Sequence, residues 1–258
     1  TIALATNNAS GTIKSAAEGL TDTVTNDGAV ELTGGTLSTD IVSSTSDTTK
    51  GTINATGNVD IAGTSTVTQN AITIAANKTL TNGGSIDSAT VTGASGANLS
   101  LATGSSLTAT SVSLTNGNLT ITDDALFVAS ADVANGSVIL NAATANTVLI
   151  SPITGSDDVD VTSAGSNAIT IASAISGATA INVNANSNLT VTDAVTASTT
   201  AGITMASGST LTLNNTLPDD NDMNVGNNIS GSGYTVNVEN DNDTSVIIAS
   251  DVTGADSV

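Results

Sequence analysis

A short alternation of the form apolar-x-apolar recurs along most of this chain and limits what it can fold into. Examples are Ile72-Thr73-Ile74, Leu119-Thr120-Ile121 and Ile169-Thr170-Ile171, in which the central residue is hydroxylated. A period of two is that of a β-strand with one buried face. Turn signals such as Asn116-Gly117 and Asn135-Gly136 separate the units. The sequence therefore predicts an all-β fold.

The units return at a nearly constant interval. Members of one series lie 19 to 22 residues apart, at Leu80, Leu99, Leu119, Val138, Val159, Ile181 and Ile203. A coil of this length with two or three short strands has the size of one turn of a parallel β-solenoid. We therefore expect a solenoid, of the right-handed β-helix kind, with rungs of about 19–22 residues. Neighbouring turns would lie about 4.8 Å apart, and the chain would hold roughly 13 turns at most.

Two other readings compete with the solenoid. An all-β sandwich uses strands of about five to six residues and usually has several core aromatics, whereas this chain has one Tyr, one Phe and no Trp. Disordered chains have low overall hydrophobicity, whereas 38% of these residues are hydrophobic and fall in a regular pattern.

The spacing divides the chain into an N-terminal capping or edge region (1–50), a β-solenoid (51–217) and an acidic C-terminal region with terminal strands (218–258).

The charge limits the partners that the chain can have. Its net charge is -20, and its cations are Lys14, Lys50 and Lys78. Three cations do not neutralise a row of phosphates, so we expect no nucleic-acid partner. An anionic membrane surface would repel the chain, and no apolar run approaches the length of a membrane-spanning helix, so we expect no membrane insertion. Hard cations such as calcium would be attracted.

The densest polar feature is the acidic C-terminal region, where PDDNDMN (218–224) and ENDNDT (239–244) both concentrate Asp and Asn. Asp-x-Asp/Asn spacing lets a loop place oxygen ligands around calcium. The candidate ligands of a structural calcium ion are Asp219, Asp220, Asp222, Asp241 and Asp243. The alternative is a solvated acidic loop, because no twelve-residue EF-hand pattern is present.

Further carboxylates occur in Asp123-Asp124 and in Asp157-Asp158 with Asp160. Paired carboxylates can hydrolyse glycosidic bonds, which makes a carbohydrate-active β-helix enzyme a minor alternative. The chain has two aromatic residues, no arginine and no histidine, so the usual groups that bind sugars and transfer protons are missing. The sequence therefore predicts no enzymatic activity and no catalytic residues.

The two ends of a solenoid carry unpaired strand edges, which attract other chains. The N-terminal segment TIALAT alternates Ile2 and Leu4 with small residues, and the C-terminal segment SVIIASDV contains Val246 and Ile248. We expect these four residues to lie at assembly edges. An end-to-end contact that does not close generates a filament, so a homo-oligomer or polymer is predicted.

The repeated Leu-Thr-Val, Ile-Thr-Ile and Ser-Gly-Ser-Thr-Leu-Thr-Leu patterns, from about residue 50 to 215, resemble secreted bacterial β-helical proteins of the adhesin and autotransporter-passenger kind. The composition is also similar to that of surface-layer and sheath proteins. The resemblance implies an extracellular protein of the bacterial cell surface. The leading hypothesis is a non-enzymatic structural rod that self-assembles end to end into a fibre or lattice. The alternative is an adhesin passenger or stalk that binds a cell-surface or glycan ligand.

Overall fold

The apolar-x-apolar units form short strands that pair in parallel from one turn to the next. In the computed structural model 64% of the chain is strand, and the strands build a parallel β-solenoid with about 11 turns in total. The structure describes residues 2, 6–44, 51–149, 152–192, 195–196, 202–215, 222–226, 228–240, 245–248 and 251–258. The predicted fold class is confirmed, while the handedness stays a prediction.

The register of the strands agrees with the spacing in the sequence. Leu80 pairs with Leu99 in the next turn, and Val159 pairs with Ile181. Ile181 then pairs with Ile203. One interval of 19 to 22 residues is therefore one turn of the coil.

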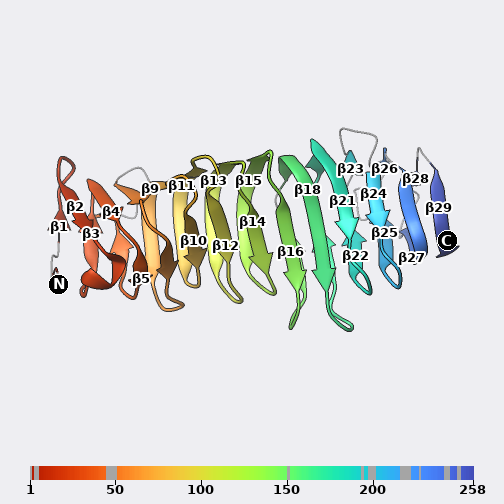
Figure 1. The fold of residues 1–258 in the computed structure, drawn as a ribbon, viewed down its shortest axis with the longest axis horizontal. Coiled ribbons are helices and arrows are strands. Elements are labelled where there is room, and N and C mark those ends of the chain that lie inside the picture. The colour runs from red at the N-terminus through yellow and green to blue at the C-terminus, as the bar shows by residue number, and fades with distance from the viewer. Residues whose placement is uncertain are drawn as a thin grey trace. The chain divides into compact units, whose positions relative to one another are not determined.

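The chain divides into two compact units, and the first contains residues 1–120 and 125–135. Its turns follow one another in chain order (Figure 1), and the pairings between successive turns place its strands in three parallel stacks. The first stack contains β1 (Thr6–Asn7), β3 (Val24–Asn26), β6 (Ile41–Val42) and the first halves of β9 (Thr66–Ile74), β11 (Ser85–Gly93), β13 (Ser106–Thr115) and β15 (Leu126–Ala134). The second contains β2 (Thr12–Ser15), β4 (Ala29–Leu32), β7 (Thr52–Ala55) and the second halves of β9, β11, β13 and β15. The third contains β5 (Gly35–Leu37), β8 (Val59–Ile61), β10 (Thr79–Asn82) and β12 (Asn98–Leu101).

The second unit contains residues 121–124 and 136–258, and its strands likewise form three parallel stacks. Strand β14 (Leu119–Thr122) crosses the division. One stack contains β17 (Thr147–Leu149), β19 (Ile169–Ile171), β22 (Asn188–Val191), β25 (Thr210–Asn215) and the end of β27 (Ile229–Asn240). Another contains the start of β18 (Ile153–Ser163), β20 (Ile175–Ser176), β23 (Val195–Thr196), β26 (Met223–Val225) and β28 (Val246–Ile248). The last contains β16 (Val138–Ala142), the end of β18, β21 (Ala178–Val183), β24 (Gly202–Met205), the start of β27 and β29 (Val252–Ser257).

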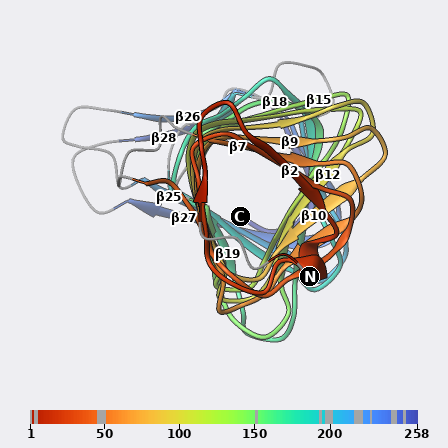
Figure 2. The ribbon, with the colours of Figure 1, turned by 90° about the vertical axis from the view of Figure 1, so that its left-hand side faces the viewer.

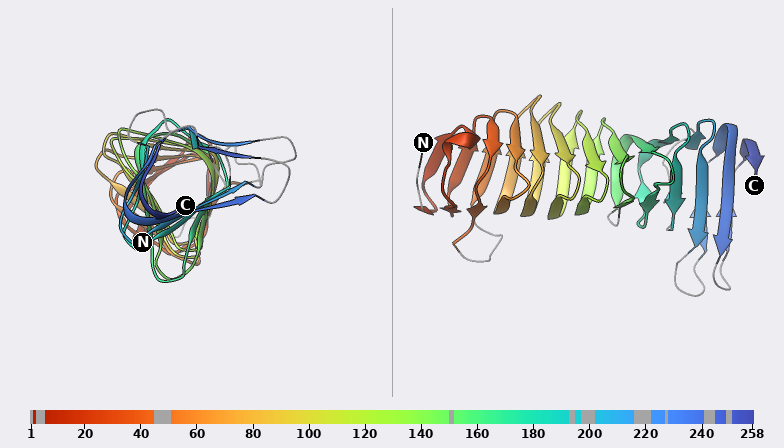
Figure 3. Two further views of the ribbon diagram at one scale, coloured as in Figure 1. Left: turned by 90° about the vertical axis from the view of Figure 1, so that its right-hand side faces the viewer. Right: turned by 90° about the horizontal axis from the view of Figure 1, so that it is seen from below.

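Several strands are longer than the three residues expected from the repeat. Strand β11, for example, runs for nine residues because the backbone bends from one side of the coil to the next without leaving the sheet. Seen end-on, the turns of the first unit overlie one another around a common interior (Figure 2). In the second unit, β25 to β28 extend outward on one side of the coil (Figures 2 and 3).

Inward side chains stack in columns along each unit. In one column of the first unit, Leu32, Ala55, Ile74, Gly93 and Leu114 follow one another from turn to turn. Large and small residues alternate, and a Cβ atom added to Gly93 would lie 2.6 Å from Cδ2 of Leu114. The leucine therefore fills the space that the glycine leaves, which gives the close packing typical of protein interiors.

The N-terminal turn contains the only helical element in the described part of the chain, a 3-10 helix η1 (Ala17–Gly19). Ile13, Ala17 and Leu20 are buried, so the inward residues of this first turn are covered. No helix among the described residues is long and apolar enough to cross a membrane. The predicted boundary at 50/51 borders a segment outside the described residues, and the one at 217/218 lies within such a segment.

Candidate functional site

The terminal turn of the second unit differs from the turns before it in the exposure of its apolar residues. Val246 and Ile248 pair with Met223 and Val225 of the preceding turn. Met223 and Val225 are buried, whereas Val246 and Ile248 are half-buried. Val238, which pairs with the buried Leu213, has an exposed fraction of 49%. The terminal face, defined as Val238 with β28 and β29, therefore leaves the apolar interior partly uncovered.

At the N-terminal end, Ile2 forms a parallel bridge with Leu20 and is half-buried, and Leu4 lies outside the described residues. Strand β1 pairs with β3, and β2 pairs with β4. Within the described part of the chain, the other edges of β1 and β2 have no strand partner. Assembly through Ile2, Leu4, Val246 and Ile248 stays a prediction.

Of the five proposed calcium ligands, only Asp222 lies within the described residues. Its Oδ1 accepts a hydrogen bond from the backbone N–H of Ser245 at 3.0 Å, which joins two successive turns. Asp219, Asp220, Asp241 and Asp243 lie outside the described residues. The described ranges contain no cluster of three acidic residues arranged to hold a metal ion, and calcium binding stays a prediction.

The bond made by Asp222 belongs to a recurring pattern at the corners of the coil. A side-chain Oδ1 of Asp or Asn accepts the backbone N–H at the same corner of the next turn, at 2.7 to 3.4 Å. Residues that accept in this way are Asp27, Asp40, Asn58, Asn98, Asn146, Asp222 and Asn228. These side chains satisfy backbone groups that the turns leave without a strand partner.

A second set of amides lies inside the coil. Asn7, Asn26 and Gln69 are at most 6% exposed. Nδ2 of Asn7 donates to Oδ1 of Asn26 at 2.7 Å, and Nδ2 of Asn26 donates to Oε1 of Gln69 at 2.6 Å. Oδ1 of Asn26 also accepts the N–H of Gly28 at 3.2 Å. This buried amide ladder crosslinks the first turns of the first unit.

The apolar-x-apolar repeat does not predict this ladder, although the sequence contains a signal for it. In Asn26-Asp27-Gly28 and Asn82-Gly83-Gly84, the asparagine points inward and its Oδ1 accepts the N–H of the glycine two residues later. A Cβ atom on Gly28 or Gly84 would lie 2.4 or 2.2 Å from a backbone oxygen. The pattern Asn-x-Gly after a short strand therefore marks a corner with a buried asparagine.

In the second unit Asp123 has a similar structural role. It is 3% exposed and has a φ of 50°. Its Oδ1 accepts the N–H groups of Thr144 at 2.8 Å and of Ala145 at 3.2 Å, and its Oδ2 accepts the hydroxyl of Thr144 at 2.9 Å. The carboxylate is thus occupied by groups of its own chain, which leaves Asp124 as the exposed member of the predicted acidic pair.

The carboxylates of β18 lie on the outside of the second unit. Asp158 and Asp160 flank the buried Val159, and Oδ1 of Asp160 accepts Nδ2 of Asn182 in the next turn at 3.0 Å. Partial burial raises the pKa of Asp158, and the charges of Asp160 and Asp157 raise it further.

In the first unit, Nζ of Lys14 lies 2.6 Å from Oε1 of Glu31. The hydrogen bond from Lys14 holds the pKa of the Glu31 carboxyl below its usual value.

Replacing Asp158 with asparagine tests the raised pKa. A carboxyl whose pKa is higher in the folded than in the unfolded state destabilises the fold above that folded pKa, and its effect disappears below its unfolded pKa. We expect Asp158→Asn to raise the free energy of unfolding by about 0.5 kcal/mol at pH 7 and to leave it unchanged below about pH 3.5. Urea denaturation at both pH values measures this difference. Asp87→Asn, which also removes an exposed charge, is the control, and an equal gain from both variants would contradict the prediction.

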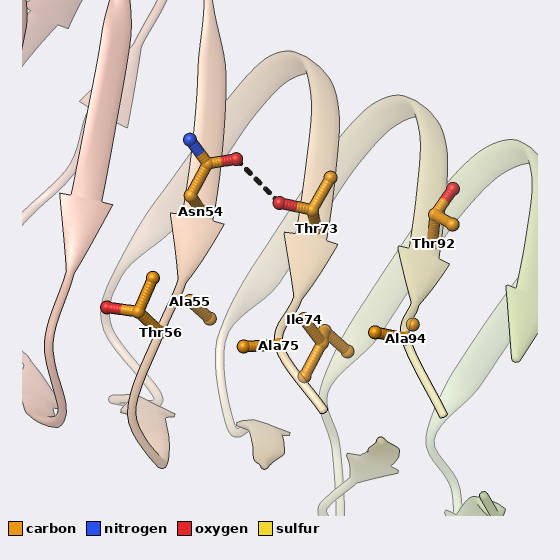
Figure 4. Close-up of a pocket in the computed structure, with 9 residues that line it drawn as sticks. Asn54, Ala55, Thr56, Thr73, Ile74, Ala75, Thr92 and Ala94 are labelled. Atoms are coloured by element: carbon orange, nitrogen blue, oxygen red, sulfur yellow. Dashed lines mark hydrogen bonds between the residues drawn. The ribbon is translucent and has the colours of Figure 1, made fainter. Parts of the chain in front are cut away.

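A shallow depression of about 310 Å³ lies on the side of the first unit, where β7, β9 and β11 end. Asn54, Thr73 and Thr92 stand in one outward row across the three turns, and the hydroxyl of Thr73 donates to Oδ1 of Asn54 at 2.6 Å (Figure 4). Ile74, Gly93, Thr56 and three alanines line the rest of it. The depression is mostly apolar, and no carboxylate lines it.

Comparison with known proteins does not place the chain in a family. No protein-family model, no curated protein and no solved structure matches the chain. The class that the fold defines is therefore the parallel β-solenoid.

Proposed function

We propose that this chain is a non-enzymatic structural protein of the bacterial cell surface, a β-solenoid that self-assembles end to end into an extracellular fibre or lattice. The observation that carries the proposal is the terminal face. There Val238 is 49% exposed, and Val246 and Ile248 are half-buried, while the inward residues of the preceding turn are buried. Covering this apolar area with another turn is favourable by the hydrophobic effect.

The sides of each unit support the same proposal. Their outward rows consist mainly of hydroxyl and amide groups, as in the row Asn54, Thr73, Thr92 and Ser113 of the first unit. The net charge of -20 also opposes lateral association. Polar, acidic sides together with an apolar end favour growth along the coil axis over aggregation in all directions.

An adhesin or stalk with a cell-surface or glycan ligand is the second candidate, and the depression beside β7, β9 and β11 favours it. Its apolar floor and polar rim could contact a ligand along the coil. We rank it below the structural role because both aromatic residues, Phe127 and Tyr234, are buried and neither is free to stack on a sugar ring.

A pair of valines on the second unit gives a matched test of the proposed function. Val238 lies on the terminal face with an exposed fraction of 49%, and Val148 lies on the outside of β17 with an exposed fraction of 44%. We expect the wild-type protein and Val148→Lys to form species that lengthen with concentration, whereas Val238→Lys lowers their fraction at least tenfold. Light scattering after size-exclusion chromatography and negative-stain electron microscopy measure this. A wild-type protein that stays monomeric at high concentration and at every salt concentration would overturn the proposal.

A further inference from the structure

One side of the first unit carries an outward row that crosses seven successive turns. The row follows the second stack of strands, and each step in it is a parallel strand pairing. In order, its members are Lys14, Glu31, Asn54, Thr73, Thr92, Ser113 and Asp132. Figure 4 shows the middle of the row, where Asn54, Thr73 and Thr92 stand on three neighbouring strands. Within these seven turns the row has a cation at one end, a carboxylate at the other and Thr73 at its centre.

The middle of this row lies in the least charged part of the chain. From residue 51 to 122 the charged residues are Asp60, Lys78 and Asp87. None of the three lies on the second stack, because Asp60 is in β8, Lys78 precedes β10 and Asp87 is in the first half of β11. Repulsion between two copies, which the net charge of -20 causes elsewhere, is therefore weakest on this side.

The other carboxylates of the first described turns lie away from the row. Glu18 lies over Gly35 of the third stack, and Asp22 precedes β3 of the first stack. Asp27 lies at the corner between the first and second stacks, where its Oδ1 accepts the N–H of Ser44. On this side, the described part of the first turns therefore has Lys14 and Glu31 as its charged residues, and Lys14 keeps a side-chain exposure of 65%.

The order of these charges makes the row complementary to its own reverse. A two-fold axis along β9 at Thr73 would place a second copy against this side with its coil antiparallel to the first. Lys14 of each copy would then lie opposite Asp132 of the other, three turns from the axis. Two copies in the same direction would instead place Lys14 against Lys14 and Asp132 against Asp132, which like-charge repulsion opposes.

The side chains between the two ion pairs suit a close contact. In the antiparallel arrangement Ser113 faces Glu31, to which its hydroxyl can donate, and Asn54 faces Thr92. The contact would also cover the mostly apolar depression beside Thr73, which the hydrophobic effect favours. Sheets packed face to face lie about 10 Å apart, a gap that a lysine and an aspartate side chain bridge together.

The size of this side sets the expected strength of the contact. Seven turns about 4.8 Å apart and strands of about four residues give a side of roughly 450 Å² per copy. Two copies would therefore bury about 900 Å² in total, which is the size of weak, reversible contacts. A dimer that dissociates on dilution is expected.

From this we infer that this side of the first unit binds a second copy of the chain in an antiparallel two-fold contact centred on Thr73, with Lys14 of each copy paired with Asp132 of the other. A two-fold contact occupies the row of both copies, so it pairs two coils and does not extend sideways. The contact lies along the side of the coil and does not use the terminal face. It therefore goes beyond the proposed end-to-end assembly and does not depend on it.

Reversing one charge tests the ion pairs. Asp132→Lys would place two lysines together at both ends of the contact, whereas Asp87→Lys makes the same change of charge on the first stack, away from the row. Both are combined with Val238→Lys, which is designed to remove the end contact. Sedimentation equilibrium over a concentration series measures the dissociation constant of the dimer. We expect Asp132→Lys to raise it at least tenfold and Asp87→Lys not to raise it. Equal weakening by both changes, or no dimer in Val238→Lys itself, would overturn the inference.

Single cysteines test the direction and the register, because the chain has no cysteine of its own. Glu31→Cys and Ser113→Cys would face each other in the contact, whereas like positions would lie four turns apart, about 19 Å along the coil. We expect a short bismaleimide crosslinker to join the two variants in an equal mixture at least tenfold more than it joins either variant alone. Mass spectrometry of the crosslinked peptides identifies the positions.

The crosslinks also separate this inference from the proposed end-to-end growth. Crosslinks between like positions would indicate parallel coils, and a mixture without the mixed dimer would indicate another register or no contact. Either result overturns the inference, even where the wild-type protein forms long species. Mixed crosslinks in a wild-type protein that does not elongate would support the side contact and leave the end-to-end proposal without support.

Discussion

Replacing Asn26 with leucine will lower the stability of the first unit by about 4 kcal/mol. The side chain is fully buried and joins Asn7, Gln69 and Gly28. Leucine has a similar volume but leaves Oε1 of Gln69 and the N–H of Gly28 without this partner, and each buried unsatisfied group costs about 1–3 kcal/mol. Urea denaturation followed by far-UV circular dichroism measures the loss.

Two variants show whether the loss comes from the buried amides. Asn54→Leu replaces an outward-facing amide whose Oδ1 accepts the hydroxyl of Thr73, and we expect a loss below about 1 kcal/mol. Asn26→Leu combined with Gln69→Leu removes both partners of one bond, so the double variant should lose less than the sum of the single variants. An Asn26→Leu protein as stable as Asn54→Leu would show that the ladder does not stabilise the unit.

Replacing Asp123 with alanine will destabilise the second unit to a similar extent, by about 4 kcal/mol. The change removes the acceptors of the Thr144 N–H, the Ala145 N–H and the Thr144 hydroxyl. It also leaves alanine at a φ of 50°, without the local hydrogen bonds by which an aspartate tolerates this left-handed conformation. Fluorescence of Tyr234, the only tyrosine, reports on unfolding of this unit because the residue is buried there.

Asp123→Asn separates the contribution of the hydrogen-bond acceptors from that of the left-handed backbone conformation. Asparagine keeps an Oδ1 acceptor and tolerates the left-handed conformation, so we expect it to cost about 1 kcal/mol. Asp124→Ala, at the exposed neighbouring position, is the control for loss of one charge. Equal unfolding midpoints for Asp123→Ala and Asp124→Ala would contradict the structural role of Asp123.

The repeat in the sequence was sufficient to predict the fold because each inward residue recurs one turn later. The pairs Leu80 with Leu99 and Ile181 with Ile203 follow from spacing alone. The strand lengths did not follow, since in β11 the backbone continues through a corner that the pattern treats as a break. Roughly 13 turns were the predicted maximum, and about 11 are present, because the corners of the coil differ in length.

The candidate site was harder to predict, since it depends on what neighbouring turns leave uncovered. The sequence marks Val246 and Ile248 as strand residues, but the partial exposure of Val238 follows only from the register of β27 with β25. The buried amides could have been predicted, because Asn26 lies two residues after the inward Val24, in phase with the buried face. The outward-facing Asn54 directly follows the inward Ile53 and is therefore out of phase with it.

The column from Leu32 to Leu114 has a consequence for how such a chain can change its length. The sequence repeats once per turn, yet the packing in this column repeats every two turns, with Ala55 and Gly93 between larger residues. Excising the single turn that contains Gly93 would bring Ile74 against Leu114, two large side chains where the coil has room for one. Excising two adjacent turns would preserve the alternation, so duplications and deletions in this part of the gene are best accommodated in pairs of turns.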